Sequence, residues 1–270
     1  WLLTNHYFPW VTAYQEFSAF LAALLLWSLC VWRGFYLPAI ALLFVALAIV
    51  PLLQWALGLV LFFGDAFIAS VYLLGFALAL GLGESLSSSV ERQQKLVSIL
   101  AMLLLLAGVL SVWIAIRQWM MMPGSIWFVD LRSGGRPFAN FAQPNNLAIF
   151  LCMGLAGVLY FFEIRRLGGW SASLLAAFLI FGVALTQSRT PWVVALVVCV
   201  FWFFKGRSIA VRLPLPALLV WVCLYAVLVM ALPWIAELLL LHTEDPLMRA
   251  QAMHRLDLWQ QLANAVVQGP

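Results

Sequence analysis

One arginine lies between two long apolar runs, in the segment Gln187-Ser188-Arg189-Thr190-Pro191. An arginine at membrane depth costs about 2.5–3.5 kcal/mol on insertion scales, so its presence favours a functional role. Thr190 is a suitable cap for a helix with Pro191 at its first position, which leaves unpaired backbone N–H groups beside Arg189. A guanidinium group beside a helix N-terminus attracts anions. The alternative is that Arg189 extends to a lipid phosphate and takes no part in chemistry.

A second polar cluster precedes another apolar run. It consists of Arg132, Arg136, Asn140, Gln143, Asn145 and Asn146. Asn145 and Asn146 lead directly into apolar residues, and amide side chains at that depth need hydrogen-bond partners. Gln143 followed by Pro144 predicts a second helix start suited to an anion. The alternative interpretation is a solvated loop.

The last part of the sequence holds a third set of polar residues, on a helix predicted from residue 245 onward. Arg255 and Trp259 lie one turn apart on the apolar side of this helix. Arg255 is therefore a second candidate anion ligand, and stacking on Trp259 is its structural alternative. His254 and His242 are candidate acids or bases.

Motifs for nucleotide hydrolysis, serine hydrolysis and zinc binding are absent from the sequence. The four cysteines have no paired spacing and lie in apolar runs, so we interpret them as packing residues: Cys30, Cys152, Cys199 and Cys223. We therefore predict no metal and no cofactor. The cationic and amide-rich residues instead predict a phosphate or diphosphate group on a lipid as the ligand.

The elements that must position these residues are membrane helices. Of the 270 residues, 66% are apolar and only 9% are charged, which no soluble domain can accommodate. A membrane-spanning helix needs about 20 residues, so the chain has room for about eight spans. We predict an all-α, polytopic membrane helix bundle with spans near residues 17–32, 35–50, 65–83, 96–117, 144–162, 170–187, 191–204 and 215–234. The apolar segment from Pro51 to Phe63 is too short to cross and is interpreted as re-entrant or interfacial.

Loop charges predict the orientation of these spans. Threaded alternately, the spans place most short-loop cations on one side, which the positive-inside rule identifies as the cytoplasm: Arg33, Arg92, Lys95, Arg165, Arg166, Lys205, Arg207 and Arg212. The loop at 118–143, the turn at Arg189 and the tail after Pro233 then face outward. We divide the chain into a transmembrane domain at 1–234 and the start of a large outward loop at 235–270, and expect a fragment at both ends.

Three blocks follow one another in a recognisable order. The first runs from Asn140 to Ala148, the second from Gln187 to Thr190, and the third joins Arg255 and Trp259 to Gly269-Pro270. In this order they resemble the bacterial O-oligosaccharyltransferases that glycosylate pilin and other periplasmic proteins. That family is related to the O-antigen ligases and to the O-antigen polymerase C-terminal domain family. An N-terminal block, Asn5 to Trp10, is similar to the version in the protein-glycosylating branch.

The resemblance implies an enzyme of the bacterial inner membrane with its active site facing the periplasm. Such enzymes move a preassembled glycan from undecaprenyl diphosphate to Ser or Thr hydroxyls of a periplasmic acceptor such as pilin, without nucleotide, metal or nucleic acid. It further implies that Arg189 and Arg255 hold the diphosphate, and that a substrate-binding pocket is lined by Arg136, Asn140, Gln143, Asn145, Asn146, Ser188 and Thr190. In that family the loop continues to a histidine thought to act as general base, so we expect the base beyond Pro270, with His254 as the alternative.

Two other functions fit part of the pattern. An O-antigen ligase or polymerase shares the three blocks but transfers to a sugar, and only the N-terminal block favours a protein acceptor. A lipid-linked glycan transporter or flippase belongs to another class and tends to show paired halves with broken midplane helices. This sequence has no internal repeat, and its unusual polar residues lie on one predicted face.

Overall fold

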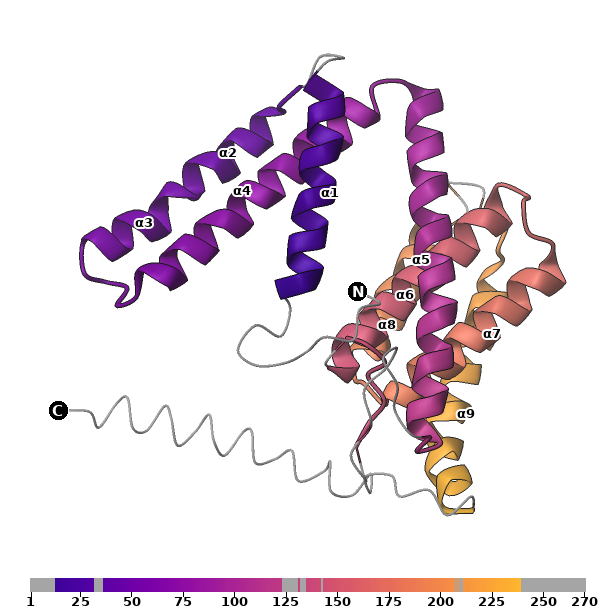
Figure 1. The fold of residues 1–270 in the computed structure, drawn as a ribbon. Coiled ribbons are helices and arrows are strands. Elements are labelled where there is room, and N and C mark those ends of the chain that lie inside the picture. The colour runs from indigo at the N-terminus through magenta and orange to yellow at the C-terminus, as the bar shows by residue number, and fades with distance from the viewer. Residues whose placement is uncertain are drawn as a thin grey trace. The chain divides into compact units, whose positions relative to one another are not determined.

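The computed structural model describes residues 13–31, 36–122, 131, 135–141, 143–206, 208 and 211–238. Over these residues the chain forms α-helices and no β-strand, as predicted (Figure 1). The helices are α1 (Ala13–Val31), α2 (Ala39–Leu47), α3 (Ile49–Ala56), α4 (Phe63–Leu86), α5 (Val90–Trp119), α6 (Pro144–Glu163), α7 (Gly169–Thr186), α8 (Thr190–Lys205) and α9 (Leu215–Leu238).

Six helical stretches within the described residues are long and apolar enough to cross a membrane: α2 with α3, α4, α5, α6, α7 and α9. The other two predicted spans fall on α1 and α8, whose apolar stretches, Glu16–Val31 and Thr190–Lys205, are shorter. The protein is therefore a polytopic membrane helix bundle. By this criterion of length, the described residues hold two spans fewer than the eight that we predicted.

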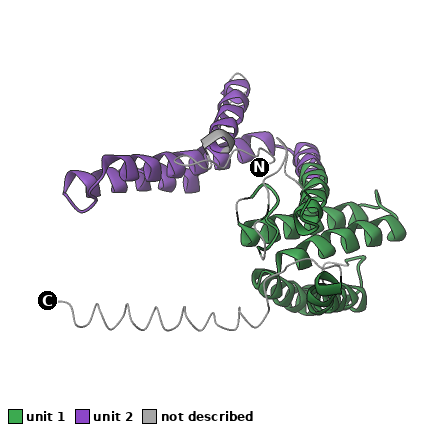
Figure 2. Ribbon diagram, turned by 60° about the horizontal axis from the view of Figure 1, so that its bottom comes forward, with its two compact units in different colours: residues 1–4, 101–270 green, residues 5–100 purple. Residues whose placement is uncertain are grey.

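The chain forms two compact units, which Figure 2 colours separately. The N-terminal unit lies within residues 5–100 and the C-terminal unit within residues 101–270. The boundary falls inside α5, after Leu100. The described residues of the predicted substrate site belong to the C-terminal unit.

In the N-terminal unit, α1, α2 and α3 pack against α4. Pro51 explains the division between α2 and α3, because a proline cannot donate a hydrogen bond to the carbonyl of Leu47. The helix is interrupted at Ala48 and resumes at Ile49, so that α2 and α3 together form one apolar stretch, Ala39–Ala56. The separate re-entrant or interfacial segment that we predicted from Pro51 to Phe63 is therefore wrong, since its first part completes a span and its end begins α4.

In the C-terminal unit, four helices form a ring in which α6 contacts α7, α7 contacts α9, α9 contacts α8 and α8 contacts α6. Small residues allow the end of α5 to pack closely on this ring. A Cβ atom added to Gly157 of α6 would lie 2.8 Å from the carbonyl oxygen of Ala101 in α5, and one added to Gly182 of α7 would overlap the side chain of Val112. Close backbone approach of this kind is typical of helix packing in membranes.

The helix order places the polar residues at one end of this unit. The C-terminal ends of α5 and α7 and the N-terminal ends of α6 and α8 carry or adjoin the described polar residues Gln118, Asn140, Gln143, Asn145, Asn146, Thr186, Ser188 and Arg189. At the opposite end, both carboxylate oxygens of Glu163 accept backbone N–H groups, from Arg212 at 2.7 Å and from Leu213 at 2.9 Å. This carboxylate holds the loop between α8 and α9 against the end of α6.

Candidate functional site

The turn that carries Arg189 joins α7 directly to α8. Gln187 caps α7 in the left-handed conformation, with φ 45° and ψ 35°. This conformation costs a residue with a Cβ atom about 1–2 kcal/mol, which is why glycine is preferred there. The chain therefore reverses within three residues and leaves Arg189 exposed at the start of α8.

Ser188 links this turn to the other polar block. Its side chain is only 2% exposed, and its hydroxyl donates to the amide oxygen of Asn145 at 2.9 Å. The hydroxyl oxygen of Ser188 in turn accepts the backbone N–H of Thr190 at 3.3 Å. The structure thus joins two blocks that lie 43 residues apart in the sequence. Ser188 and Asn145 hold the turn against the first turn of α6.

Tyr225 of α9 supports the turn from the other side, although the sequence analysis did not select it. Its hydroxyl donates to the backbone carbonyl of Ser188 at 3.1 Å, and its ring lies 4.7 Å from that of Trp192. The side chain is 5% exposed. A tyrosine inside an apolar helix gives no signal of its partner in the sequence, but a buried hydroxyl always requires one.

Gln118, at the end of α5, is a second residue that the sequence analysis missed. Its side-chain nitrogen donates to the carbonyl of Ala139 at 3.0 Å, and its oxygen accepts the N–H groups of Ala139 at 2.7 Å and Phe138 at 3.1 Å. Ala139 has a positive φ of 49° and is completely buried. This one side chain therefore fixes the segment that leads to Asn140, which is itself buried.

The helix starts differ in one respect from our prediction. Gln143 caps α6 and Pro144 opens it, as predicted, but Thr190 does not cap α8: it is the first helical residue, and Arg189 takes the cap position. Ser188 provides the side-chain acceptor instead, because its hydroxyl lies within reach of the N–H of Thr190.

The prediction of unpaired N–H groups beside Arg189 is wrong for the amides of Thr190 and Trp192. The N–H of Thr190 bonds to Ser188, and the N–H of Trp192 bonds to the Arg189 carbonyl at 3.2 Å. In α6, the N–H groups of residues 146 and 147 bond to the carbonyl of Gln143, both at 3.2 Å. In each helix, one of the first positions is also occupied by proline, which has no backbone N–H group. An anion here would therefore be held by side chains and by the helix dipoles.

The remaining predicted site residues differ in exposure. Gln143 and Asn146 are exposed, whereas Arg136, Asn145 and Thr190 are half-buried. Arg132, Arg255, Trp259, His242 and His254 lie outside the described residues, as do the blocks at residues 5–10 and 269–270. Over the residues that the structure does describe, no cluster of His, Cys, Asp or Glu side chains could hold a metal ion.

Comparison with known proteins finds two similar proteins. No family model matches the chain, and no solved structure gives a significant match. A general O-oligosaccharyltransferase of Acinetobacter baylyi is 34% identical over 278 aligned positions, which cover all of this chain and 49% of that protein. The chain is similar to the O-oligosaccharyltransferases along its whole length.

A second member of this family is also similar. It is the ComP-specific O-oligosaccharyltransferase of the same organism, which is 24% identical over 268 positions, or 96% of this chain and 47% of that protein. The chain spans about half the length of both curated oligosaccharyltransferases. The likeness extends over both compact units.

Proposed function

We propose that this protein is a membrane glycosyltransferase that moves a preassembled oligosaccharide from undecaprenyl diphosphate to Ser or Thr hydroxyls of a periplasmic protein such as pilin. Similarity to two O-oligosaccharyltransferases supports the reaction class. The proposal for the donor group depends on the chemistry of the Arg189 turn.

The observation that carries the proposal is the hydrogen bond between Ser188 and Asn145. It brings a turn with an exposed guanidinium group to the start of a helix rich in amide side chains, and both belong to the blocks that resemble the family. Because Ser188 is buried and its hydroxyl is engaged, we propose that it positions the turn, whereas Arg189 contacts the donor.

Transfer of a glycan from a lipid diphosphate leaves negative charge on the departing diphosphate. A fixed guanidinium group stabilises that charge, and its planar fork can bind two phosphate oxygens at once. We propose Arg189 as one such ligand, with Gln143 and Asn146, which are exposed, as further polar contacts. The positive ends of the α6 and α8 dipoles favour the same charge.

The acceptor hydroxyl needs a base, because neutral Ser and Thr are poor nucleophiles. Arg255 is proposed as a second diphosphate ligand and His254 as a candidate base, on the strength of the resemblance alone. The charge pattern of the loops supports an active site that faces the periplasm from the inner membrane, with Arg165, Arg166 and Lys205 in the cytoplasm.

The experiment replaces Arg189 by lysine, which retains the charge but loses the fork. Hydrogen bonds to charged groups are worth about 1.5–3 kcal/mol, so in the full-length enzyme we expect transfer to an acceptor peptide to fall about ten-fold or more at normal membrane abundance. Arg166→Lys is the matched control, because Arg166 is exposed at the opposite end of the unit. Unchanged transfer by Arg189→Lys would remove this residue from the donor site.

The same assay separates the alternative functions. Product on a sugar acceptor but not on the peptide would identify a ligase or polymerase. Movement of the lipid-linked glycan across the membrane without any product would identify a flippase.

A further inference from the structure

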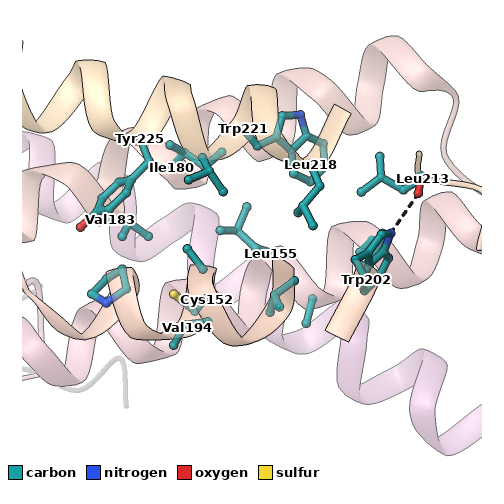
Figure 3. Close-up of a pocket in the computed structure, with 16 residues that line it drawn as sticks. Cys152, Leu155, Ile180, Val183, Val194, Trp202, Leu213, Leu218, Trp221 and Tyr225 are labelled. Carbon is teal, nitrogen blue, oxygen red and sulfur yellow. Dashed lines mark hydrogen bonds between the residues drawn. The ribbon is translucent and has the colours of Figure 1, made fainter. Parts of the chain in front are cut away.

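An apolar cavity of about 330 Å³ lies between the four helices of the ring, α6, α7, α8 and α9 (Figure 3). Its walls include Cys152 of α6, Val183 of α7, Ala195 of α8 and Trp221 of α9. This volume is about twice that of an engineered protein cavity that binds benzene. A void of this size deprives its walls of packing contacts, so an apolar occupant stabilises the bundle.

The chemistry of the walls favours an apolar occupant over water. A buried water needs two to four polar partners. The polar atoms on two of the lining side chains are already engaged: the indole N–H of Trp202 donates to the carbonyl of Leu213 at 3.0 Å, and the hydroxyl of Tyr225 donates to Ser188. Aliphatic and aromatic carbon makes up most of the remaining lining.

The shape of the cavity fits a chain better than a compact group. Its lining on α8 extends from Pro191 to Trp202, which at 1.5 Å per residue corresponds to about 16 Å along the helix. This is roughly half the thickness of the hydrocarbon core of a bilayer. The cavity therefore runs along the membrane-embedded part of the ring and does not lie across it.

One end of the cavity adjoins the candidate site. Tyr225 and Pro191 line the cavity, and the same two residues border the Arg189 turn: Tyr225 through its bond to the Ser188 carbonyl, and Pro191 through its place in the first turn of α8. A molecule with a charged group at Arg189 and an apolar chain would extend into this cavity directly.

We propose that this cavity binds the first isoprene units of the polyprenyl chain of the donor, and that Tyr225 transmits its occupancy to the Arg189 turn. The inference rests on the proposed function, since it takes the donor to be a polyprenyl diphosphate. The chain and the diphosphate are then recognised by separate surfaces that share one tyrosine.

The first experiment fills the cavity. Ala195→Phe adds a ring on the cavity face of α8, and Val193→Phe, at a position that is 62% exposed on the same helix, is the matched control. Two donors carry the same glycan diphosphate, one on undecaprenol and one on a butyl group. We expect Ala195→Phe to raise KM for the undecaprenyl donor about ten-fold, as expected when roughly two buried methylenes are excluded, and to leave kcat/KM for the butyl donor unchanged. Val193→Phe should change neither.

An equal loss with both donors, or an unchanged KM for the undecaprenyl donor, would overturn the inference. A second measurement tests the inference independently of whether the variant folds and of whether the proposed function is correct. Wild-type protein is irradiated with a polyprenyl diphosphate that carries a benzophenone in its first isoprene units, and the labelled residues are mapped by mass spectrometry.

Label on the cavity residues of α6, α8 or α9 that undecaprenyl phosphate displaces supports the inference, even if the protein transfers no glycan. Absence of glycan transfer by the full-length wild-type enzyme counts against the proposed function alone. If phosphatidylglycerol displaces the label as well as undecaprenyl phosphate does, the cavity binds ordinary acyl chains. If the cavity is not labelled, another segment occupies it. Either result overturns the inference.

Discussion

Replacing Gln118 by leucine should release the segment that carries Asn140. The leucine side chain is apolar and of similar size, so packing at this buried position is largely retained. The change removes three hydrogen bonds to the backbone of residues 138 and 139. The perturbation is therefore a loss of backbone partners with little change in volume.

The structure sets the magnitude. Ala139 is 0% exposed, so its N–H and C=O groups cannot find water unless the segment opens, whereas Phe138 is half-buried. A buried polar group without a partner costs about 1–3 kcal/mol, which gives about 2–6 kcal/mol for the two groups of Ala139. The positive φ of Ala139 adds to the tendency to open, because Gln118 stabilises a strained conformation. The lower bound alone corresponds to roughly 30-fold more opening.

Hydrogen exchange in detergent measures this opening. We expect the amide of Ala139, which bonds to Gln118 at 2.7 Å, to exchange at least roughly 30-fold faster in Gln118→Leu. Gln118→Glu should give an intermediate result, since a carboxylate accepts both N–H groups but cannot donate to the carbonyl. Trp113→Leu, at a position of α5 that is 56% exposed, is the control for a change on the same helix. Unaltered protection at residues 138 and 139 in Gln118→Leu would show that other contacts hold the segment and would refute the reasoning.

Two further predictions concern the backbone of the C-terminal unit. Gln187→Gly should raise the thermal unfolding temperature, because it removes about 1 kcal/mol of strain from the left-handed conformation, and a lower unfolding temperature would contradict the assignment of strain. The same variant should lower glycan transfer if the glutamine side chain contacts the substrate. Gly157→Ala should destabilise the protein by about 1–3 kcal/mol, because its new methyl group would meet the Ala101 carbonyl at 2.8 Å, whereas Gly168→Ala, with nothing within 4 Å, should have little effect; equal melting curves for the two variants would show that α5 and α6 can separate without cost.

The fold class followed from the sequence because its cause is local. Runs of apolar residues about 20 long have to form helices in a membrane, since each backbone polar group must be paired within the segment. The start of the helix at Pro144 was also predictable from the local sequence, because proline has no N–H group and suits the first turn, where N–H groups have no acceptor within the helix. The Pro51 segment was mispredicted because a proline can interrupt a helix without ending the span.

The candidate site was only partly predictable. Arg189 and Asn145 stand out because polar residues in apolar surroundings need a reason, and this is visible in the sequence itself. Gln118 and Tyr225 are also polar residues in apolar surroundings, yet their partners are backbone groups at residues 139 and 188 in other segments. Because residues of every type have these backbone groups, the sequence does not show which ones are the partners.

The sequence by itself determined that the chain forms membrane helices and which end of the bundle is rich in polar residues. The tertiary structure alone decided which helices form a ring, that an apolar cavity lies between them, and that the first amides of α8 are already paired. The physical reason is that helix formation depends on neighbours within a few residues, whereas a hydrogen bond from Ser188 to Asn145 depends on how two separate helices pack.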